Sequence, residues 1–492
     1  MTSATFLASA SREVHLPGYD RSGVTAGIVH FGVGGFHRAH QALAIDRLLN
    51  QGLAQDWAIC GVGLMPGDVR MKRVMDDQDC LYTLVEKASD GSREARVVGS
   101  IIDYHYAPDD VEAVLEKMAD AGTRIVSLTV TEGGYNISPV TGEFDLANPA
   151  VVADLQPGAV PATTFGLVTE ALRRRRDRGT GAFTVMSCDN IQENGVVARR
   201  AFTAFAQARD PELAQWIEQE CRFPNSMVDR ITPVTTDDDR AEILAQFGVA
   251  DGWPVVAEPF FQWVLEDSFA AGRPPVELAG VQVVEDVEPY ELMKLRLLNC
   301  GHQALAYFGY LSGYRFAHEA AQDPDFAQYV LNYMYSEAMP TLRPVPGVDL
   351  DDYAHTLIQR FSNAEVKDTL ARLCLEGSDR IPKWLVPVIK ENLAQGRPIR
   401  ISAAIVASWA RYAEGVDEGG QPIQVVDRLA ASLVPTARTQ RTDPSAFLRN
   451  RELFGDLVDD GRFVSAYEQA LHSLHNRGAR ATVADLAGAL QT

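Results

Sequence analysis

Residues 27–40 have the sequence Gly-Ile-Val-His-Phe-Gly-Val-Gly-Gly-Phe-His-Arg-Ala-His. The apolar run at 27–31 predicts a buried strand, and residues 39–50 have the pattern of a helix. Glycines between a first strand and a helix let the backbone approach a pyrophosphate, which then lies at the helix N-terminus. The stretch therefore predicts the dinucleotide-binding turn of a Rossmann-like domain, in which the cofactor contacts Gly32, Val33, Gly34, Gly35 and Phe36.

This fingerprint is incomplete, because His37 occupies the place of its third glycine, and an ordinary glycine-rich turn is the alternative. An acidic residue after the second strand should bind the adenosine ribose, and Asp68 is the best candidate. A carboxylate there repels a 2′-phosphate, which favours NAD as the cofactor over NADP. Arg70 weakens that preference, because it could pair with such a phosphate.

Apolar strand-like runs alternate with helical patterns through the first half of the chain. Strands are expected at 27–31, 57–64, 81–86, 96–102, 124–130 and 182–187, and further helices at 108–121 and 165–178. Such alternation predicts an α/β fold with a doubly wound, mostly parallel sheet. After about residue 286 the pattern is helical, at 291–311, 325–338, 351–361, 367–375 and 401–412. We therefore expect a Rossmann-type NAD-binding domain at 1–285 and a mainly α-helical substrate-binding domain at 286–492.

The net charge and the cysteine spacing indicate which partners and which cellular compartment the protein has. The chain has 45 Lys plus Arg against 66 Asp plus Glu, a formal net charge of -21 that disfavours binding to nucleic acid or anionic membranes. Its six cysteines include no CxxC pair, which indicates a reduced, cytoplasmic protein. We expect no signal peptide and no membrane span, because every apolar run is too short.

The segment at 290–302, Tyr-Glu-Leu-Met-Lys-Leu-Arg-Leu-Leu-Asn-Cys-Gly-His, places polar side chains in an apolar helical pattern. On an ideal α-helix, His302 lies roughly 80° and Asn299 roughly 140° from Lys294, which puts Asn299 at the edge of one broad polar arc. A lysine beside neutral donors in a partly dry site has its charged form disfavoured, so that it can accept a proton. The alternative is that Lys294 reaches solvent while the other two bond to local backbone.

Three further stretches complete a recognisable pattern. They are Thr-Val-Thr-Glu-Gly-Gly-Tyr at 129–135, Ser-Cys-Asp-Asn-Ile-Gln-Glu-Asn-Gly at 187–195 and Phe-Pro-Asn-Ser-Met-Val-Asp-Arg at 223–230. Together with the glycine turn and the segment at 290–302, they make the chain resemble the polyol-specific long-chain dehydrogenases. The resemblance covers nearly the whole chain.

The resemblance implies a general base at Lys294, with Asn190 and Asn299 bound to the reacting oxygen. It also implies that His302 positions the substrate. Oxidation of a secondary alcohol requires loss of the hydroxyl proton as hydride leaves, so two amide donors can stabilise the developing alkoxide. We expect Glu291, one turn before the lysine, to pass the proton to solvent. From the residues alone, Asn190 is more simply a turn-forming asparagine.

Further substrate contacts follow from the resemblance. Val228, Asp229 and Arg372 match family positions that line the polyol chain, and Arg380 or Lys383 could reach its far hydroxyls. For the last two residues, a surface salt bridge is an equal alternative.

The implied reaction is metal-independent, NAD-dependent interconversion of D-mannitol and D-fructose, with D-arabinitol or D-sorbitol as further substrates. The resemblance implies a monomer. Gly67 departs from the family pattern, because relatives can carry a second acidic residue there, and this softens the preference for NAD. Fructuronate and tagaturonate reductases share most of the motifs and are the closest alternative, since Arg372, Arg380 or Lys383 could pair with a uronate carboxylate.

Three other classes compete with this interpretation. Tyr290 and Lys294 also form the Tyr-x-x-x-Lys pair of short-chain dehydrogenases, but far too late in the chain for that architecture. A zinc-dependent dehydrogenase needs a third ligand beside His37 and His40, and none is apparent. A non-catalytic nucleotide-sensing protein would not need the polar set around Lys294.

Overall fold

The computed structural model describes residue 6 and residues 10–138 and 142–488. The chain divides into two compact units, Met1–Glu288 and Pro289–Thr492, each described here by itself.

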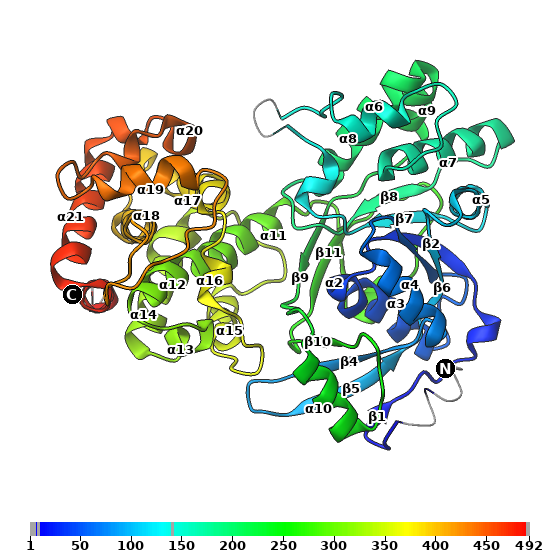
Figure 1. Cartoon of the computed structure of the whole chain (residues 1–492), viewed down its shortest axis with the longest axis horizontal. Coiled ribbons are helices and arrows are strands. Elements are labelled where there is room, and N and C mark those ends of the chain that lie inside the picture. The colour runs from blue at the N-terminus through cyan, green and yellow to red at the C-terminus, as the bar shows by residue number, and fades with distance from the viewer. Residues whose placement is uncertain (1–5, 7–9, 139–141, 489–492) are drawn as a thin grey trace. The chain divides into compact units, whose positions relative to one another are not determined.

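The first unit is built on a five-stranded parallel sheet (Figure 1). In spatial order its strands are β6 (Ile101–Tyr106), β3 (Ala58–Gly63), β2 (Ala26–Phe31), β7 (Ile125–Leu128) and β8 (Thr184–Ser187). Numbered along the chain, this is the Rossmann order 3-2-1-4-5, which confirms the predicted fold class. The order reverses between β2 and β7, and ligands of such sheets bind at the carboxyl ends of the strands beside that point.

Helices cover both faces of this sheet. Successive side chains of a strand point to opposite sides, and here the side chains on both sides are apolar and buried under helices. Ile28 and Ile59 belong to a core that includes α3, whereas Val29 and Val62 belong to a second core with α5, α7 and α8. The helices of this unit are α2 (Gly35–Ala39), α3 (Gln41–Asn50), α4 (Asp68–Asp77), α5 (Val111–Ala119), α6 (Pro149–Asp154), α7 (Thr164–Arg178), α8 (Asn194–Arg209), α9 (Pro211–Glu220), α10 (Asp237–Phe247) and the short η1 (Arg21–Gly23), η2 (Glu132–Tyr135) and η3 (Val276–Ala279).

Two smaller sheets complete the first unit. One has the order β1 (Val14–His15), β5 (Arg93–Val98), β4 (Tyr82–Lys87) and β10 (Val255–Ala257), and the other has β12 (Gln282–Val284), β11 (Gln262–Glu266) and β9 (Ser226–Asp229). The prediction of one strand at 96–102 is wrong, because β5 and β6 lie in different sheets. The chain changes sheets at Gly99 and Ser100, where the Gly99 N–H donates to Asp46 Oδ1 (2.9 Å) and the Ser100 hydroxyl donates to the Ala42 carbonyl (2.6 Å).

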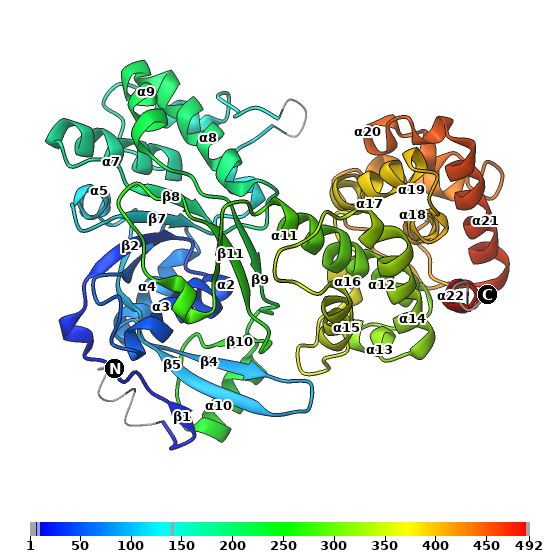
Figure 2. The same ribbon diagram turned by 180° about the vertical axis from the view of Figure 1, so that it is seen from behind.

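The second unit is helical, as the sequence predicts (Figure 2). Its elements are α11 (Glu288–Met293), η4 (Lys294–Asn299), α12 (Cys300–Leu311), α13 (Ala317–Ala321), α14 (Pro324–Tyr333), η5 (Met334–Ala338), η6 (Met339–Thr341), α15 (Leu350–Phe361), α16 (Leu370–Leu373), α17 (Gly377–Ala394), α18 (Arg400–Tyr412), α19 (Ala430–Arg438), η7 (Phe447–Arg449), α20 (Arg451–Phe454), η8 (Leu457–Asp459), α21 (Gly461–Arg477) and α22 (Ala479–Ala487). Helices α12 and α18 are buried along almost their whole length and form its core.

The helix predicted at 291–311 is continuous but not uniform. Between α11 and α12 the backbone forms η4, a π-helical segment in which hydrogen bonds join residues five apart instead of four. Such segments are rare and occur frequently at functional sites.

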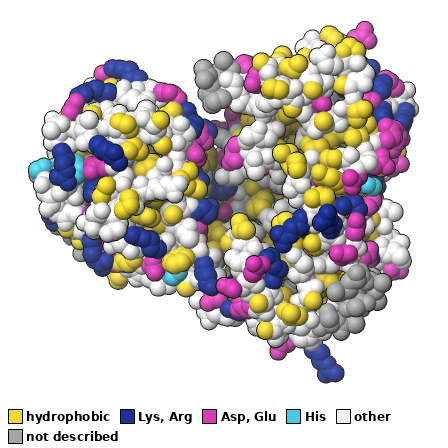
Figure 3. Space-filling view, in the orientation of Figure 1, with side chains coloured by type: hydrophobic (Ala, Val, Ile, Leu, Met, Phe, Trp, Pro, Cys, Tyr) yellow, Lys and Arg dark blue, Asp and Glu magenta, His cyan; other side chains and the backbone are white. Residues whose placement is uncertain are grey.

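Charged side chains of both signs are spread over the surface. On the face drawn in Figure 3, Lys and Arg side chains form several separate groups with Asp and Glu between them. Over the described ranges, no helix is long and apolar enough to cross a membrane.

Candidate active site

The glycine turn lies at the carboxyl end of β2, beside the point where the strand order reverses. Gly32 has φ +90°, and a Cβ there would lie 2.1 Å from the Thr129 carbonyl oxygen of the neighbouring strand end. At Gly34 and Gly35, in contrast, a Cβ would meet no protein atom closer than 3.5 Å. Gly32 is therefore required by the fold, whereas a Cβ at either of the other two glycines would make only ordinary van der Waals contacts with the protein. A glycine turn at the carboxyl end of a strand, without side chains at 34 and 35, fits a pyrophosphate.

Three histidines pack beneath and beside this turn. His37, in place of the third glycine, stacks on His30 with ring centroids 3.4 Å apart, and both rings are buried. The His30 Nδ1 lies 2.8 Å from Ser127 Oγ. His40 lies against Phe36 and its Nε2 lies 3.0 Å from the Gln262 carbonyl. The histidines at 37 and 40 thus pack in the core next to the turn.

The buried histidines predict loss of stability in acid. Burial lowers the pKa of His30 to about 3, and burial and neighbouring charges hold the pKa of His37 well below its usual 6.5. Between those values the unfolded chain binds more protons than the folded chain, so stability falls as the pH falls below about 6.5. For each histidine we expect a loss of about 1.4 kcal/mol in the free energy of unfolding per pH unit. Urea titrations at several pH values measure this slope.

The variant His30→Asn isolates one contribution. It should unfold with a shallower pH dependence over the same window, whatever its absolute stability. An unchanged slope in this variant would show that another group dominates the acid lability.

Asp68 begins α4 directly after β3. Its Oδ2 accepts hydrogen bonds from the N–H groups of Leu64 and Met65, both at 2.8 Å, and so fixes the turn that follows the strand. In the described part of the chain, Oδ1 accepts no hydrogen bond. Arg70 stacks on Trp253, with its guanidinium carbon 4.3 Å from the ring centroid. The carboxylate that was predicted to bind ribose thus also has a structural role, and the nearby cation is held by an aromatic ring.

Asn190 follows β8 and is exposed, next to the buried Asp189. The Asp189 carboxylate accepts hydrogen bonds from the Val130 and Thr131 N–H groups at 3.0 and 2.8 Å, and the Tyr135 hydroxyl lies 2.8 Å from it. Burial raises the pKa of Asp189. This carboxyl group joins the ends of β7 and β8, and so fixes the backbone that carries Asn190.

Asn194 fixes the other side of the same loop. Its side-chain amide donates to the carbonyls of Asp189 (3.0 Å) and Ser226 (2.8 Å), and its Oδ1 accepts from the Ser226 N–H (2.9 Å). Ser226 begins β9, which places the predicted substrate residues Val228 and Asp229 at its third and fourth positions, both buried. Asn190 and β9 are therefore held in one hydrogen-bonded frame within the first unit.

Arg230, the residue after β9, links this hydrogen-bonded frame to the helix that follows the glycine turn. Its buried guanidinium donates to the Ala39 carbonyl at the end of α2 (2.6 Å) and to the Glu258 carbonyl, and it is paired with Glu86. Sequence reasoning assigned no role to Arg230, Asp189 or Asn194. All three lie within the motifs that carry the resemblance, and that position was the only signal that could have pointed to them.

The four polar residues predicted at 291–302 lie on consecutive elements of the second unit. Glu291, Lys294, Asn299 and His302 are all buried, with 6 to 9% of their surface exposed. Lys294 and Asn299 are the first and last residues of η4, and π-helical pairing joins these two positions. The ring of His302 packs on Phe361, with centroids 4.3 Å apart.

The π-helical segment corrects the predicted arc. It contains one residue more than an α-helix of the same rise. Around the helix axis, every later residue therefore lies about 100° behind the position that it would have in a regular α-helix. Asn299 then lies about 40° from Lys294 instead of about 140°, and His302 about 20° instead of about 80°. On this helical geometry the lysine, the asparagine and the histidine share one stripe about 60° wide.

Tyr290 has a structural partner. Its hydroxyl donates to the Pro346 carbonyl at 2.7 Å within the same unit. This bond gives the hydroxyl a structural role, and that Tyr290 does not exchange the proton stays a prediction.

The predicted cations of the second unit are already engaged. The Arg372 guanidinium binds both carboxylate oxygens of Asp368 at 2.7 and 2.6 Å, and this pairing raises the arginine pKa. Lys383 forms an ion pair with Asp379 at 2.8 Å, and Arg380 donates to the Leu373 carbonyl at 2.9 Å. For Lys383 the structure shows the surface salt bridge that the sequence left open.

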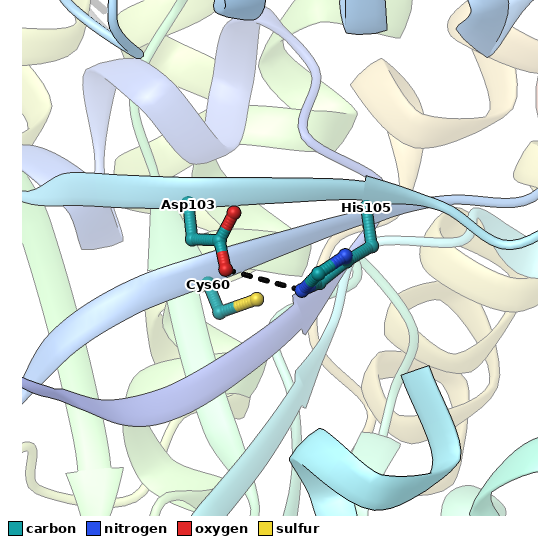
Figure 4. Close-up of side chains that lie close together, drawn as sticks. All are labelled: Cys60, Asp103 and His105. Carbon is teal, nitrogen blue, oxygen red and sulfur yellow. Dashed lines mark ion pairs between the residues drawn. The ribbon is translucent and has the colours of Figure 1, made fainter. Parts of the chain in front are cut away.

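Among the residues that the structure describes, one group could hold a metal ion, and none of its members is a predicted catalytic residue. Cys60 on β3 and Asp103 and His105 on β6 have ligand atoms within 4.8 Å of one another (Figure 4). Asp103 Oδ2 lies 3.1 Å from His105 Nε2, and burial raises the pKa of the Cys60 thiol. A thiol that resists ionisation is a poor metal ligand. His37 and His40 are not members of this group.

Comparisons with known proteins agree with the resemblance over nearly the whole chain. The family models of the mannitol dehydrogenase Rossmann domain and C-terminal domain match residues 26–278 and 286–475. Mannitol 2-dehydrogenase of Phaeosphaeria nodorum is 49% identical over 97% of this chain and 84% of its own.

Two solved structures are similar over nearly their whole length. Pseudomonas fluorescens mannitol 2-dehydrogenase, in a ternary complex with NAD and D-mannitol, has a TM-score of 0.88 and 45% identity, covering 99% of both chains. A substrate-free D-sorbitol dehydrogenase has a TM-score of 0.91 and 41% identity, covering 97% of this chain and 99% of its own. The chain therefore belongs to the mannitol dehydrogenase family.

Proposed function

We propose that this protein is a metal-independent, NAD-dependent dehydrogenase that interconverts D-mannitol and D-fructose. Family membership makes it an oxidoreductase acting on a CH–OH group. An enzyme of this kind is not the non-catalytic nucleotide-sensing protein that the sequence left as an alternative. The observation that carries the choice of substrate is the full-length similarity to the Pseudomonas fluorescens enzyme that binds NAD and D-mannitol. We assign cofactor binding to residues 1–285 and substrate binding to residues 286–492.

When bound, NAD accepts the hydride from carbon 2 of the polyol. In this proposal Lys294 enters the reaction with a neutral amine and takes the proton of the carbon-2 hydroxyl, so that the alcohol becomes a ketone. Asn190 and Asn299 donate hydrogen bonds to the reacting oxygen and stabilise its alkoxide character. His302 orients the substrate, and Glu291 passes the proton from the lysine to solvent. The shared stripe of Lys294, Asn299 and His302 supports these roles.

Val228, Asp229, Arg372, Arg380 and Lys383 are proposed to line the rest of the polyol. The ion pairs of Arg372 with Asp368 and of Lys383 with Asp379 make these two cations less suited to a uronate carboxylate. Arg380 donates to the Leu373 carbonyl, so it is the cation that the uronate alternative would use. D-arabinitol and D-sorbitol are proposed as further substrates.

A substrate panel tests this proposal. Initial rates with D-mannitol, D-arabinitol, D-sorbitol, D-fructose and fructuronate are measured with NAD(H) and NADP(H), before and after exhaustive chelation. We expect D-mannitol and D-fructose with NAD(H) to give the highest kcat/KM, unchanged by chelation. A higher kcat/KM for fructuronate would identify the chain as a uronate reductase. Loss of activity on chelation, restored by zinc, would refute a metal-independent reaction.

Replacing Asp68 tests the cofactor preference. Asp68→Asn keeps a side-chain oxygen for the Leu64 and Met65 N–H groups but removes the charge that would repel a 2′-phosphate. Two charges close together near a protein surface interact by about 1 to 4 kcal/mol. We therefore expect the ratio of kcat/KM for NADP to that for NAD to rise at least about tenfold.

Asp77→Asn, at the exposed end of the same helix, is the matched control and should leave the ratio unchanged. An unchanged ratio in Asp68→Asn would remove Asp68 from the proposed cofactor site.

We also propose a reduced cytoplasmic location and a monomer, without nucleic-acid or membrane partners. All six cysteines are free and buried, which supports a reduced location. Light scattering in solution measures the molar mass, and a mass twice that of the chain would contradict the monomer.

A further inference from the structure

The π-helical segment that carries Lys294 receives a hydrogen bond from a different helix. Tyr333, the last residue of α14, is completely buried, and its hydroxyl donates to the Arg296 carbonyl at 3.1 Å. Arg296 lies in the middle of η4, between the lysine and the asparagine. One phenol therefore reaches the backbone of the segment that brings these two residues into line.

A π-helical segment needs such a donor. When hydrogen bonds join residues five apart, the helix contains one residue more than its α-helical equivalent, and one carbonyl loses its regular partner where α-pairing resumes. Here the Cys300 N–H donates to the Leu295 carbonyl, five residues earlier, and also to the Leu297 carbonyl. The carbonyl between these two, that of Arg296, accepts from Tyr333. A buried carbonyl without a partner is unfavourable, so this hydroxyl stabilises the π-helical pairing over a regular α-helix.

The phenol itself is firmly anchored. Tyr333 directly precedes η5, a second π-helical segment, whose buried Glu337 accepts hydrogen bonds from the Ile401 and Ser402 N–H groups, both at 2.7 Å. Ile401 and Ser402 lie in the first turn of α18, one of the two core helices of this unit. The Tyr333 hydroxyl is therefore placed by the core and not by the segment that it supports.

We propose that Tyr333 is a positioning residue for proton transfer, because its hydroxyl keeps η4 π-helical and thereby keeps Lys294, Asn299 and His302 on one stripe. This inference rests on the proposed catalytic role of Lys294. If η4 returned to α-helical pairing, the two later residues would turn by about 100° relative to the lysine. The stripe would become the broad arc expected of an ideal α-helix.

The test compares two tyrosines of the same helix. Tyr333→Phe removes the hydroxyl that binds Arg296, whereas Tyr329→Phe removes an equally buried hydroxyl that has no hydrogen-bond partner in the described structure. We expect Tyr333→Phe to lower kcat for D-mannitol oxidation about tenfold or more, with an altered pH profile of kcat. Its Kd for NADH should remain that of the wild type, and Tyr329→Phe should keep both the kcat and the pH profile of the wild type.

Cys300→Ala separates the two contacts of the phenol. The Tyr333 hydroxyl also interacts with the Cys300 thiol, and removing that thiol leaves the bond to the Arg296 carbonyl in place. We expect this variant to keep the kcat of the wild type. If it reproduced the loss seen in Tyr333→Phe, the thiol and not the π-helical carbonyl would be the relevant partner, and the proposal would be overturned.

The outcomes for Lys294 and Tyr333 are distinguishable. An active Lys294→Ala variant would refute the proposed base, whatever Tyr333→Phe does. An inactive Lys294→Ala variant together with a Tyr333→Phe protein that has the kcat and pH profile of the wild type would overturn the positioning role alone. A Tyr333→Phe protein with a lower melting temperature but unchanged kcat would also overturn that role, because the hydroxyl would then be only structural.

Discussion

Lys294→Ala is expected to lower kcat for D-mannitol oxidation by about 10³-fold, because loss of a positioned general base typically costs between 10² and 10⁴. The lysine is buried on the stripe that it shares with Asn299 and His302, so no other amine of that stripe can replace it. The Kd for NADH should not change, since the proposed cofactor residues lie in the other unit. Steady-state kinetics and fluorescence titration with NADH measure the two effects.

Two variants control for general damage. Lys390→Ala removes a half-exposed lysine whose ion pair with Asp456 lies at the surface, and it should leave kcat unchanged. Tyr290→Phe removes a hydroxyl that is bonded to the Pro346 carbonyl, and it should also retain activity. Added primary amines should partly restore Lys294→Ala. The opposite pattern, an active Lys294→Ala and an inactive Tyr290→Phe, would favour the short-chain mechanism.

Gly32→Ala is expected to destabilise the first unit and to abolish measurable NADH binding. The residue has φ +90°, and its new Cβ would lie 2.1 Å from the Thr129 carbonyl oxygen, so the ends of β2 and β7 must separate. A left-handed backbone costs about 1 to 2 kcal/mol, and overpacking costs about 1 to 3 kcal/mol. We therefore expect the free energy of unfolding to fall by about 3 kcal/mol. Urea titration and calorimetric titration with NADH are the measurements.

Gly34→Ala separates binding from stability. Its Cβ would meet no protein atom closer than 3.8 Å and its backbone has φ -89°, so the variant should be as stable as the wild type. The same Cβ occupies the space assigned to the pyrophosphate, so the affinity for NADH should fall at least about tenfold. If Gly34→Ala bound NADH as tightly as the wild type, the pyrophosphate could not lie on this turn.

Local patterns predicted four of the five strands of the central sheet, because β2, β3, β7 and β8 are fully buried and are followed by clear turns. The strand at 26–31, its glycine turn and the helices at 111–119 and 164–178 all lie close to their predicted positions. The expectation at 96–102 failed because the chain leaves one sheet for another at Gly99, whose N–H bonds to Asp46, more than fifty residues away. A contact so distant in sequence leaves no local periodic signal.

In the candidate site, too, local patterns predicted some features, and contacts between distant parts of the sequence determine the others. Periodicity identified the polar residues at 291–302, but it placed Asn299 at the edge of an arc because it assumed an ideal α-helix. The π-helical segment depends on a hydroxyl from Tyr333 in another helix, which periodicity cannot reveal. Likewise Asp189, Asn194 and Arg230 act through bonds to distant backbone atoms, and only their place in the family motifs drew attention to them.

Transfer of deuterium tests the central claim most directly. The purified protein is incubated with NAD and D-mannitol deuterated at both carbon 2 and carbon 5, which are equivalent by the symmetry of the molecule, after exhaustive chelation, and the products are analysed by NMR. The proposed mechanism predicts D-fructose and an equal amount of NADH that carries the deuterium at carbon 4 of the nicotinamide, with no transfer by Lys294→Ala on the same timescale. NADH without deuterium, or a product other than D-fructose, would contradict direct hydride transfer from carbon 2.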